Sequence, residues 1–251
     1  MAWQTPKIDW SAADGVRDTD MNRIEGNLLE LYKKSGLVEE TTVYVNATGG
    51  SDSTGTGSSS APYATISKAL SSLPKATNGF VASINIAAGT YDEQLEISDF
   101  SGVVRLTGTS GTIVNVTRLH VSSSVCIVNN ITLSLNHTSV SVLVNNGGTL
   151  IATGNVRVSG GTKAIDVYHG STCVISGILT LTNVATAVEA TQASRVHIGT
   201  LAGSGVTTGL RAIMGSIIHF GTITLVPSGV LHNAASGGRI YGGAQTNVPN
   251  Y

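Results

Sequence analysis

Charged and aromatic residues are scarce in this chain of 251 residues, at 12% and 5%. The net charge is −1, and Lys and Arg form no cluster of the kind that neutralises phosphates, which excludes a nucleic-acid partner. Hydrophobic residues still make up 41%, so the chain has enough apolar surface to fold. Because Ser, Thr, Asn and 30 Gly fill most other positions, the composition predicts an all-β protein that stays soluble through neutral polar side chains.

Long hydrophobic runs are also missing. No stretch of about 20 apolar residues is present, which excludes a membrane-spanning helix. Met1–Lys7 lacks the apolar core of a secretion signal. We therefore expect the protein to stay in the cytoplasm of the cell that makes it until assembly or lysis releases it. Two cysteines, Cys126 and Cys173, are too few for a disulfide framework.

The first 36 residues differ from the rest of the chain. Asp18 or Thr19 can cap a helix whose apolar residues recur at intervals of 3, 4 and 3, the a/d rhythm of a coiled coil, at Met21, Ile24, Leu28 and Leu31. Two heptads are marginal alone, so this helix makes sense if several copies of the chain are already held together. The alternative is a single amphipathic helix that packs on its own domain. Trp3 and Trp10 are expected to pack into a partner protein.

Residues 37–80 are expected to form a linker and a cap ahead of a main domain over residues 81–251. Residues 46–60 are rich in Gly, Ser, Thr and Asp, which is typical of turns. The next segment predicts a helix over residues 62–73 that starts at Pro62. One face of this helix is apolar, formed by Ile66, Ala69, Leu70 and Leu73.

A repeat of about 22 residues runs through the second half of the chain. Its anchor positions follow at intervals of 24, 23, 23, 22 and 21 residues, at Ser124, Gly148, Ser171, Ser194, Ser216 and Gly237. Two residues after the anchors stand Cys126, Leu150, Cys173, Val196, Ile218 and Arg239, and four after stand Val128, Ala152, Ile175, Ile198, Phe220 and Tyr241. Apolar columns two residues apart are what the inward positions of stacked strands require. The repeat therefore predicts a solenoid of about seven turns that is capped near Arg239.

The same geometry places the two cysteines. Both lie in one inward column, two turns apart, with Leu150 between them. That arrangement separates them by roughly 10 Å, too far for a disulfide. We expect both to fill the core.

Two parts of the chain resemble known families. Trp3–Lys7 and Asp18–Glu25 resemble the N-terminal segment of tail appendage proteins from phages and prophages of Gram-positive bacteria. The segments Asp52–Gly55, Pro62–Leu70 and Ile86–Glu93 are similar to the start of a pectate-lyase-like right-handed β-helix. This second resemblance implies a single-stranded right-handed parallel β-helix, with the helix over 62–73 covering the open end of the core, and a homotrimer with its β-helices side by side. Lyases, hydrolases and passive fibres share the fold, so it does not fix the function.

An apolar stripe supports oligomerisation independently. Three residues after the anchors, in the outward position, stand Ile127, Ile151, Val174, His197, His219 and Ile240. A solvated face would carry Ser, Thr or Lys there, so both faces of this sheet are expected to be buried, with the stripe at the trimer axis. The alternatives are a loop folded over this face, or exposed β-branched residues.

One pair of carboxyl groups has a spacing that suits catalysis. Five residues before the anchors stand Leu143, Asp166, Glu189, Arg211 and His232. Asp166 and Glu189 would point outward on adjacent turns, about 5 Å apart, as in a glycosidase. The alternative is a polar surface ladder in which Arg211 offsets the acidic pair, and we expect this alternative to hold.

No metal or cofactor is expected. Asp92, Glu93, Glu96 and Asp99 form a second acidic group, whose spacing matches no calcium loop and which we expect to be a solvated edge. His197 and His219 could bind a metal or sense pH, but two ligands do not make a zinc site.

The expected function is that of a non-enzymatic virion protein, a tail fibre, spike or baseplate appendage. Residues 1–36 would attach to baseplate or tail-tip proteins, and the Ser-, Thr- and Asn-rich β-helix would contact host cell-wall carbohydrate. One alternative is a depolymerase that cleaves such a polymer with Asp166 and Glu189. The other is an architectural adaptor that carries a separate receptor-binding protein.

Overall fold

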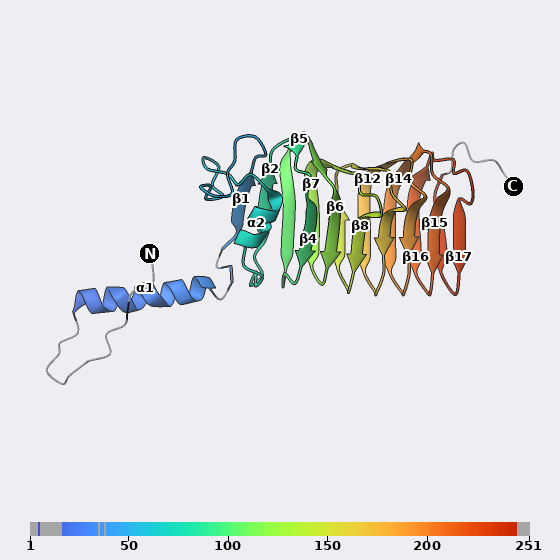
Figure 1. Cartoon of the computed structure of the whole chain (residues 1–251). Coiled ribbons are helices and arrows are strands. Elements are labelled where there is room, and N and C mark those ends of the chain that lie inside the picture. Colours follow the sequence, from blue (N-terminus) through green and yellow to red (C-terminus); the bar gives the residue numbers. More distant parts are fainter. Residues whose placement is uncertain (1–4, 6–16, 35, 38, 245–251) are drawn as a thin grey trace.

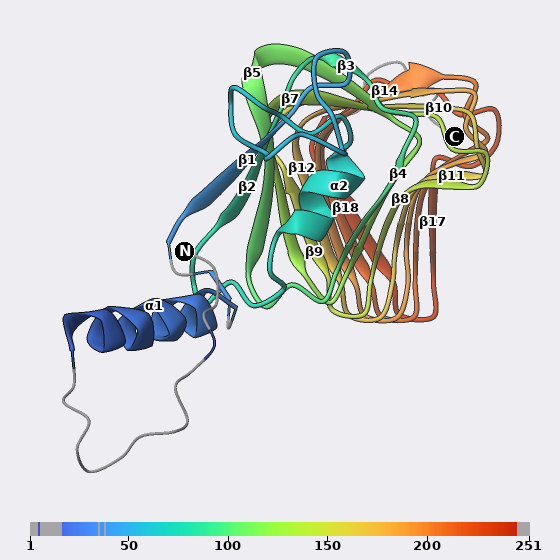
Figure 2. The same cartoon turned by 60° about the vertical axis from the view of Figure 1, so that its left-hand side comes forward.

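The chain folds into a stack of parallel β-strands with a helix at one end. A computed structural model describes residues 5, 17–34, 36–37 and 39–244. Within these residues the strands form two long parallel sheets that run along the stack, as Figure 1 shows. Seen from the end in Figure 2, successive coils lie on top of one another and enclose a common interior. The fold is the right-handed parallel β-helix that the repeat and the resemblance predicted.

The larger sheet has eleven strands and forms one long wall of the β-helix. Its strands are β1 (Thr41–Val45), β2 (Ala82–Ile86), β3 (Gly89–Thr90), β5 (Val103–Val116), β7 (Val125–Leu135), β9 (Thr149–Ala152), β10 (Val156–Ser159), β12 (Thr172–Thr182), β14 (Arg195–Ser204), β16 (Ile217–Ile223) and β18 (Arg239–Gly242). The longest of them bend, because their register shifts partway along, as between Ile175 and Ile178 of β12.

The smaller sheet has seven strands, one from each of the seven coils that contribute to both sheets. They are β4 (Gln94–Ser98), β6 (Arg118–Ser122), β8 (Val140–Asn145), β11 (Lys163–Val167), β13 (Thr186–Ala190), β15 (Thr208–Ile213) and β17 (His232–Ala235). This number agrees with the about seven turns expected from the repeat.

The predicted inward columns line the core. Leu150 pairs in register with Cys126 on one side and Cys173 on the other. Both cysteines are fully buried and unpaired. Burial raises the pKa of both thiols, that of Cys173 to about 12, so neither is a reactive thiolate.

The predicted register is wrong by one residue in the last coil. Ile218 pairs with Ile240 rather than Arg239, and Arg211 pairs with Asn233 rather than His232. The anchor of this coil is therefore Gly238 and not Gly237. The sequence alone does not distinguish these two adjacent glycines, because either suits the anchor position. Ile240 rather than Arg239 therefore continues the inward column into β18 (Arg239–Gly242), the last strand that the structure describes.

Each of the last five anchors follows a tight turn with two left-handed residues, whereas Ser124 follows one, Ser123. Buried anchor serines link neighbouring coils, since the Ser194 N–H donates to the Ser216 Oγ (3.1 Å) and the Ser171 N–H to the Ser194 Oγ (3.2 Å). The residue just before the anchor has a positive φ and is glycine in four of the last five coils, at Gly147, Gly170, Gly215 and Gly237. In the fifth it is Ala193, with φ +60°.

Replacing Ala193 with Gly is expected to stabilise the protein by about 0.5 kcal/mol. The left-handed conformation costs a non-glycine residue about 1–2 kcal/mol, and glycine avoids this cost. Glycine also gives the unfolded chain more conformational freedom, which cancels part of the stabilisation. The control is Ala185→Gly, since Ala185 is also exposed but has no positive φ, and it should destabilise by about 0.5–1 kcal/mol. Urea denaturation measures the free energy of unfolding of both variants. A change of the same sign in both would contradict the strain at Ala193.

The helix α2 (Ile66–Ser72) lies across the open end of the core, as the resemblance implied (Figure 2). It starts at Ile66 and not at Pro62, because side chains fix its first turn. The Thr65 Oγ1 accepts the Lys68 N–H (3.1 Å), and the Glu93 carboxylate accepts the N–H groups of Ile66 (2.9 Å) and Ser67 (2.7 Å). Ile66, Ala69 and Leu70 are buried against the first coils.

The helix α1 (Asp18–Lys34) stands outside the β-helix (Figure 1). Its predicted apolar residues are all exposed in the single chain, with exposed fractions of 47%, 44%, 59% and 52% for Met21, Ile24, Leu28 and Leu31. Trp3 and Trp10 lie outside the described residues. Neither of the two described helices is long and apolar enough to pass through a membrane.

The predicted outward stripe is continuous along the larger sheet as far as His219, after which Tyr241 rather than the predicted Ile240 follows. Ile127, Ile151, Val174, His197 and His219 pair in register from β7 to β16. All are half-buried within one chain except His219, which is exposed. The assignment of this stripe to a trimer interface remains a prediction.

Candidate functional site

The outer face of the seven-stranded sheet carries a row of side chains that are polar at every position except Leu143. The row is one outward column in which each residue pairs in register with the next, and it consists of Glu96, His120, Leu143, Asp166, Glu189 and Arg211. Asp166 and Glu189 lie opposite one another on the adjacent strands β11 and β13, as the repeat predicted. The row extends along the β-helix axis, so it could follow an extended ligand.

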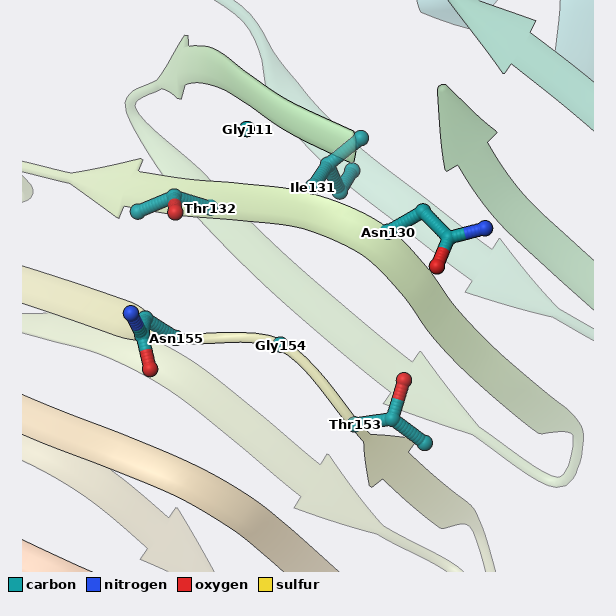
Figure 3. A pocket seen from close by; sticks show the side chains of 7 residues that line it. All are labelled: Gly111, Asn130, Ile131, Thr132, Thr153, Gly154 and Asn155. Carbon is teal, nitrogen blue, oxygen red and sulfur yellow. The ribbon is translucent and has the colours of Figure 1, made fainter. Parts of the chain in front are cut away.

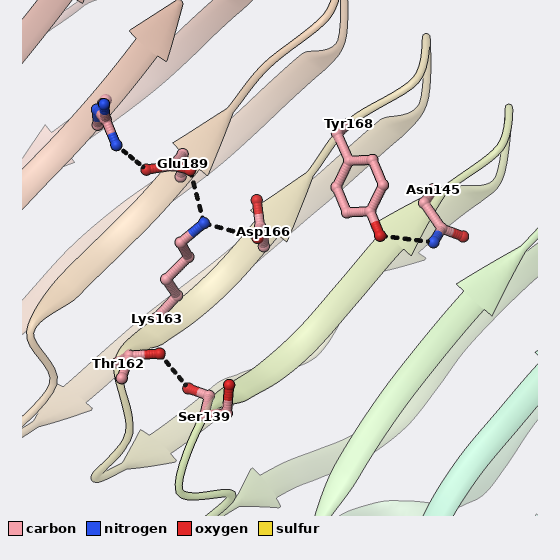
Figure 4. Close-up of polar contacts among 8 residues, drawn as sticks. Ser139, Asn145, Thr162, Lys163, Asp166, Tyr168 and Glu189 are labelled. Atoms are coloured by element: carbon pink, nitrogen blue, oxygen red, sulfur yellow. Dashed lines mark hydrogen bonds and ion pairs between the residues drawn. The ribbon is translucent and has the colours of Figure 1, made fainter.

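Lys163 joins the two carboxylates, which Figure 4 shows. Its Nζ donates to the Asp166 Oδ2 (2.8 Å) and to the Glu189 Oε1 (2.6 Å), while the Arg211 guanidinium donates to the Glu189 Oε2 (2.7 Å). The two carboxylates are 8% and 6% exposed, so they need these partners. The sequence did not reveal Lys163 as a member of this group, because strand alternation places it with the inward residues Ile165 and Val167.

The two carboxyl groups differ in acidity. Burial raises the pKa of Asp166, and the single ion pair with Lys163 only partly offsets it. Burial also acts to raise the pKa of Glu189, but hydrogen bonds and charges from Lys163 and Arg211 outweigh it and hold the pKa below its usual value. Adjacent carboxyl groups whose pKa values move apart suit an acid and a base.

A second polar group extends the row toward the N-terminal coils. The His120 Nδ1 lies 2.7 Å from the Glu96 Oε2, and the His120 Nε2 lies 3.1 Å from the Asn145 Oδ1. The Asn145 Nδ2 then donates to the Tyr168 hydroxyl oxygen (2.9 Å). We call this the Glu96–Tyr168 chain; Figure 4 shows its Asn145 and Tyr168 end.

The acidic group around Glu93 is solvated at Asp92, Glu96 and Asp99, as the sequence suggested, but two of its members also have specific partners. Glu93 accepts the first N–H groups of α2, and Glu96 pairs with His120. The partners of Glu93 are 27 and 26 residues away in the sequence, and the partner of Glu96 is 24 residues away. All of these residues precede Ser124, the first anchor of the aligned repeat.

A groove of about 440 Å³ lies beside Glu96, between α2 and β4, and is lined by Ser67, Leu70, Ser71, Lys75, Gln94, Glu96 and Ser98. The Lys75 Nζ donates to the Ser98 carbonyl (2.7 Å) and lies 3.9 Å from the centre of the Phe100 ring. Burial lowers the pKa of Lys75, and the nearby charges of Asp99 and Glu96 partly offset this. The groove thus continues the polar row at the capped end of the β-helix.

A second groove, of about 300 Å³, lies at the bend of the larger sheet (Figure 3). It is lined by Gly111, Asn130, Ile131, Thr132, Thr153, Gly154 and Asn155. Its polar side chains are neutral amides and hydroxyls, which both donate and accept hydrogen bonds and suit uncharged sugar hydroxyls.

His197 and His219 lie beside a third, largely apolar groove of about 210 Å³ on the outward stripe. Their Nδ1 atoms are 2.9 Å apart, and their rings stack with centres 5.0 Å apart. In the part of the chain that the structure describes, no three His, Cys, Asp or Glu side chains gather as metal ligands would.

These features define a parallel β-helix protein with a polar row along one outer face. A family model described as "Protein of unknown function (DUF1565)" matches residues 48–101. No curated protein sequence matches the chain. Among solved structures, the chain is similar to the pectin methylesterase from Aspergillus niger in deglycosylated form, at 15% identity and a TM-score of 0.44, over 85% of this chain and 92% of that one.

The last comparison corrects one sequence-based expectation. We expected a protein that is not an enzyme, whereas the similar structure of this fold is that of an enzyme. At this identity the likeness concerns the fold alone. The expectation that the protein is not an enzyme is therefore wrong, and the chemistry must be decided from the residues of the polar row.

Proposed function

We propose that this protein binds an extended polysaccharide along the outer face of its seven-stranded sheet, as part of a trimeric phage tail appendage. The observation that carries the binding proposal is the polar row itself. It combines carboxylates, cations, an amide and a phenol hydroxyl on consecutive strands of one face. Such groups hydrogen-bond sugar hydroxyls, and their spacing repeats with each coil as units repeat in a polymer.

The attachment part of the proposal rests on α1. Its exposed a/d residues have no cover within the chain, and a helix of two heptads gains stability from packing with copies of itself. The outward stripe on the larger sheet would bring the three β-helices together. Residues 1–36 would then hold the trimer to baseplate or tail-tip proteins, and the polar row would face the host surface.

Binding is tested with the purified full chain and isolated Gram-positive cell walls in a sedimentation assay. We expect wild-type protein to sediment with the walls and Tyr168→Ala to lose most of its binding. The matched control is Asn130→Ala in the groove of Figure 3, which should bind as wild type does. If Asn130→Ala abolishes binding and Tyr168→Ala does not, the polar row is the wrong surface.

A second candidate function is hydrolysis of the bound polymer by Asp166 and Glu189. The opposite pKa shifts of these adjacent carboxyl groups favour it. Asp166 would give its proton to the glycosidic oxygen as the C–O bond breaks, and Glu189 would attack the anomeric carbon. Water would then hydrolyse the glycosyl–enzyme ester and return its proton to Asp166, as the short carboxyl spacing implies. Lys163 would have to leave its bridging position when the substrate binds.

Release of reducing ends from the same cell walls tests this candidate. Wild-type protein should release them, and Asp166→Asn and Glu189→Gln should each lower the rate by at least about a hundredfold. Both substitutions keep the side-chain shape, so binding by sedimentation should persist. A wild-type protein that sediments with the walls and releases no reducing ends is a binder only.

A further inference from the structure

The last coils of the β-helix carry positive charge that is not balanced within the chain. No Asp or Glu follows Glu189 in the sequence, whereas three arginines do. Arg211 is bound by Glu189, but the side chains of Arg195 and Arg239 form no ion pair within the part of the chain that the structure describes. A guanidinium does not lose its proton in proteins, so this charge is permanent.

Both of these arginines lie on the outer face of the larger sheet, and both are exposed. Arg195 pairs in register with Ile217, and Ile217 pairs with Arg239. Two strand spacings, about 10 Å, therefore separate the two arginine backbones. The neighbouring outward column adds two histidines and a tyrosine at the same level. We call the six residues the C-terminal patch, which consists of Arg195, His197, Ile217, His219, Arg239 and Tyr241.

A groove of about 210 Å³ lies within this patch. It is lined by Arg195, by Ile217 and by the stacked rings of His197 and His219. Its apolar surface can contact the carbon skeleton of a ligand, and a guanidinium can bind a phosphate or a carboxylate through two parallel hydrogen bonds. A metal ion on the two histidines is disfavoured, because the positive charge of Arg195 lines the same groove.

The charges also limit where copies of the chain can touch. In a trimer with the outward stripe at its axis, each residue near the axis faces the same residue of two other copies. Ile127, Ile151 and Val174 would then make apolar contacts with their copies. On the coils that follow, Arg195 and Arg239 would bring like charges together with no acidic side chain to offset them. The contact between copies should therefore end after Val174 and leave the C-terminal patch open.

We infer that the C-terminal patch binds an oxyanion, a phosphate or a carboxylate, of an acidic surface polymer, and that Arg195 and Arg239 recognise its charge. This site is separate from the polar row of the proposed function and lies on the other sheet. The last coils are at the end of the β-helix opposite to α1 (Figure 1), so a chain attached through α1 would present the patch outward. Because salt screens exposed charges, the affinity should fall as the ionic strength rises.

Calorimetry with the full chain tests the inference with three probes: a hexamer of glycerol phosphate, hexagalacturonate and cellohexaose. In about 20 mM salt the wild-type protein should bind at least one acidic probe, and its affinity should fall about tenfold when the salt is raised to about 200 mM. The acidic probe that binds more tightly identifies the oxyanion as phosphate or carboxylate, and equal affinities mean that the charge alone is recognised. Cellohexaose carries no charge and should show no such dependence on salt.

Substitution of the arginines locates the site. Arg195→Gln and Arg239→Gln should each weaken binding of the acidic probe about five- to tenfold, since each removes a charge-assisted contact that water partly screens. Arg195→Lys keeps the charge but not the paired hydrogen bonds, so its affinity should fall between wild type and Arg195→Gln. The matched control is Arg157→Gln, because Arg157 is exposed on β10, outside the patch, and the same change of net charge there should leave the affinity unchanged.

Three results would overturn the inference: no binding of either acidic probe by the wild-type protein in low salt, unchanged affinity in both patch variants, or an equal loss in Arg157→Gln. The oligomeric mass separates the inference from the proposed trimer. Ile151→Asp should dissociate the trimer, whereas Arg195→Gln should leave the mass unchanged. If the wild-type chain is a monomer, the proposed trimer fails and calorimetry still decides the anion site. If Arg195→Gln changes the mass, the patch belongs to the contact between copies and the inference fails.

Discussion

Alanine at position 199 is expected to destabilise the fold by about 3 kcal/mol, because the added methyl group would meet backbone that cannot move. A Cβ on Gly199 would lie 2.4 Å from the Ser176 carbonyl oxygen of the preceding coil and 3.1 Å from the Gly177 carbonyl oxygen. Both carbonyls belong to a stacked strand, so relief would require a shift of the whole coil. Urea denaturation followed by circular dichroism measures the loss.

The matched control is Gly160→Ala. Gly160 has φ +73° and open space around its Cβ position, so alanine there meets only the cost of a left-handed conformation, about 1 kcal/mol. Comparable losses in the two variants would mean that coil spacing adapts to a methyl group. A clear excess for Gly199→Ala would establish that glycine sets the contact distance between coils at the bend.

Gly199 belongs to a column that the sequence contains but that apolar patterning misses. Glycines recur at intervals of 23, 22, 22 and 22 residues, at Gly154, Gly177, Gly199, Gly221 and Gly243. For each of them a Cβ would lie within 2.5 Å of a carbonyl oxygen in the coil before. Apolar patterning does not reveal this column, because glycine has no side chain and is required here for the space that it leaves free.

The core could be predicted because stacking imposes one physical rule on every coil. Positions such as Cys126, Leu150 and Cys173 must all be apolar, and strand alternation fixes their distance from the anchor. Only the position of the anchor in the last coil was predicted wrongly, because Gly237 and Gly238 both suit the turn. The left-handed φ values of Ser236 and Gly237 identify Gly238 as the anchor, since two left-handed residues precede the anchor in each of the four coils before.

The candidate site was predictable only in part. Asp166 and Glu189 followed from the register, because both lie on the regular part of a strand. Lys163 did not, since a long flexible side chain at a strand end can reach the face opposite to the one its backbone position indicates. The pairing of Glu96 with His120 lay upstream of the aligned repeat, where β5 carries extra residues at its bend.

Replacement of Lys163 with Met is the other substitution expected to have a large effect. It keeps the length of the side chain and removes the charge that holds two nearly buried carboxylates together. Breaking a buried ion pair costs about 3–5 kcal/mol. Because the Lys163 side chain is itself 28% exposed, water replaces part of the interaction, and we expect a loss of about 2 kcal/mol at neutral pH. Lys163→Arg, which retains the charge, should lose much less.

The dependence on pH identifies the cause of that loss. In the wild-type protein the lowered pKa of Glu189 contributes stability above its unfolded-state value, and this contribution disappears as the pH falls through the folded-state pKa. The raised pKa of Asp166 acts in the opposite sense, since it contributes stability at low pH that is lost as the pH rises through the folded-state value. Without Lys163 both folded-state pKa values must rise.

The difference in stability between wild type and Lys163→Met should therefore be largest near neutral pH and shrink as the pH falls through the range in which both carboxyl groups take up protons. Urea denaturation at a series of pH values measures it. Arg211→Met is the graded control, because Glu189 keeps Lys163 and the Arg211 side chain is 42% exposed, so its loss should stay below about 1 kcal/mol. A deficit for Lys163→Met that is the same at every pH would instead assign it to packing of the aliphatic chain, and the carboxylates would need no counter-charge.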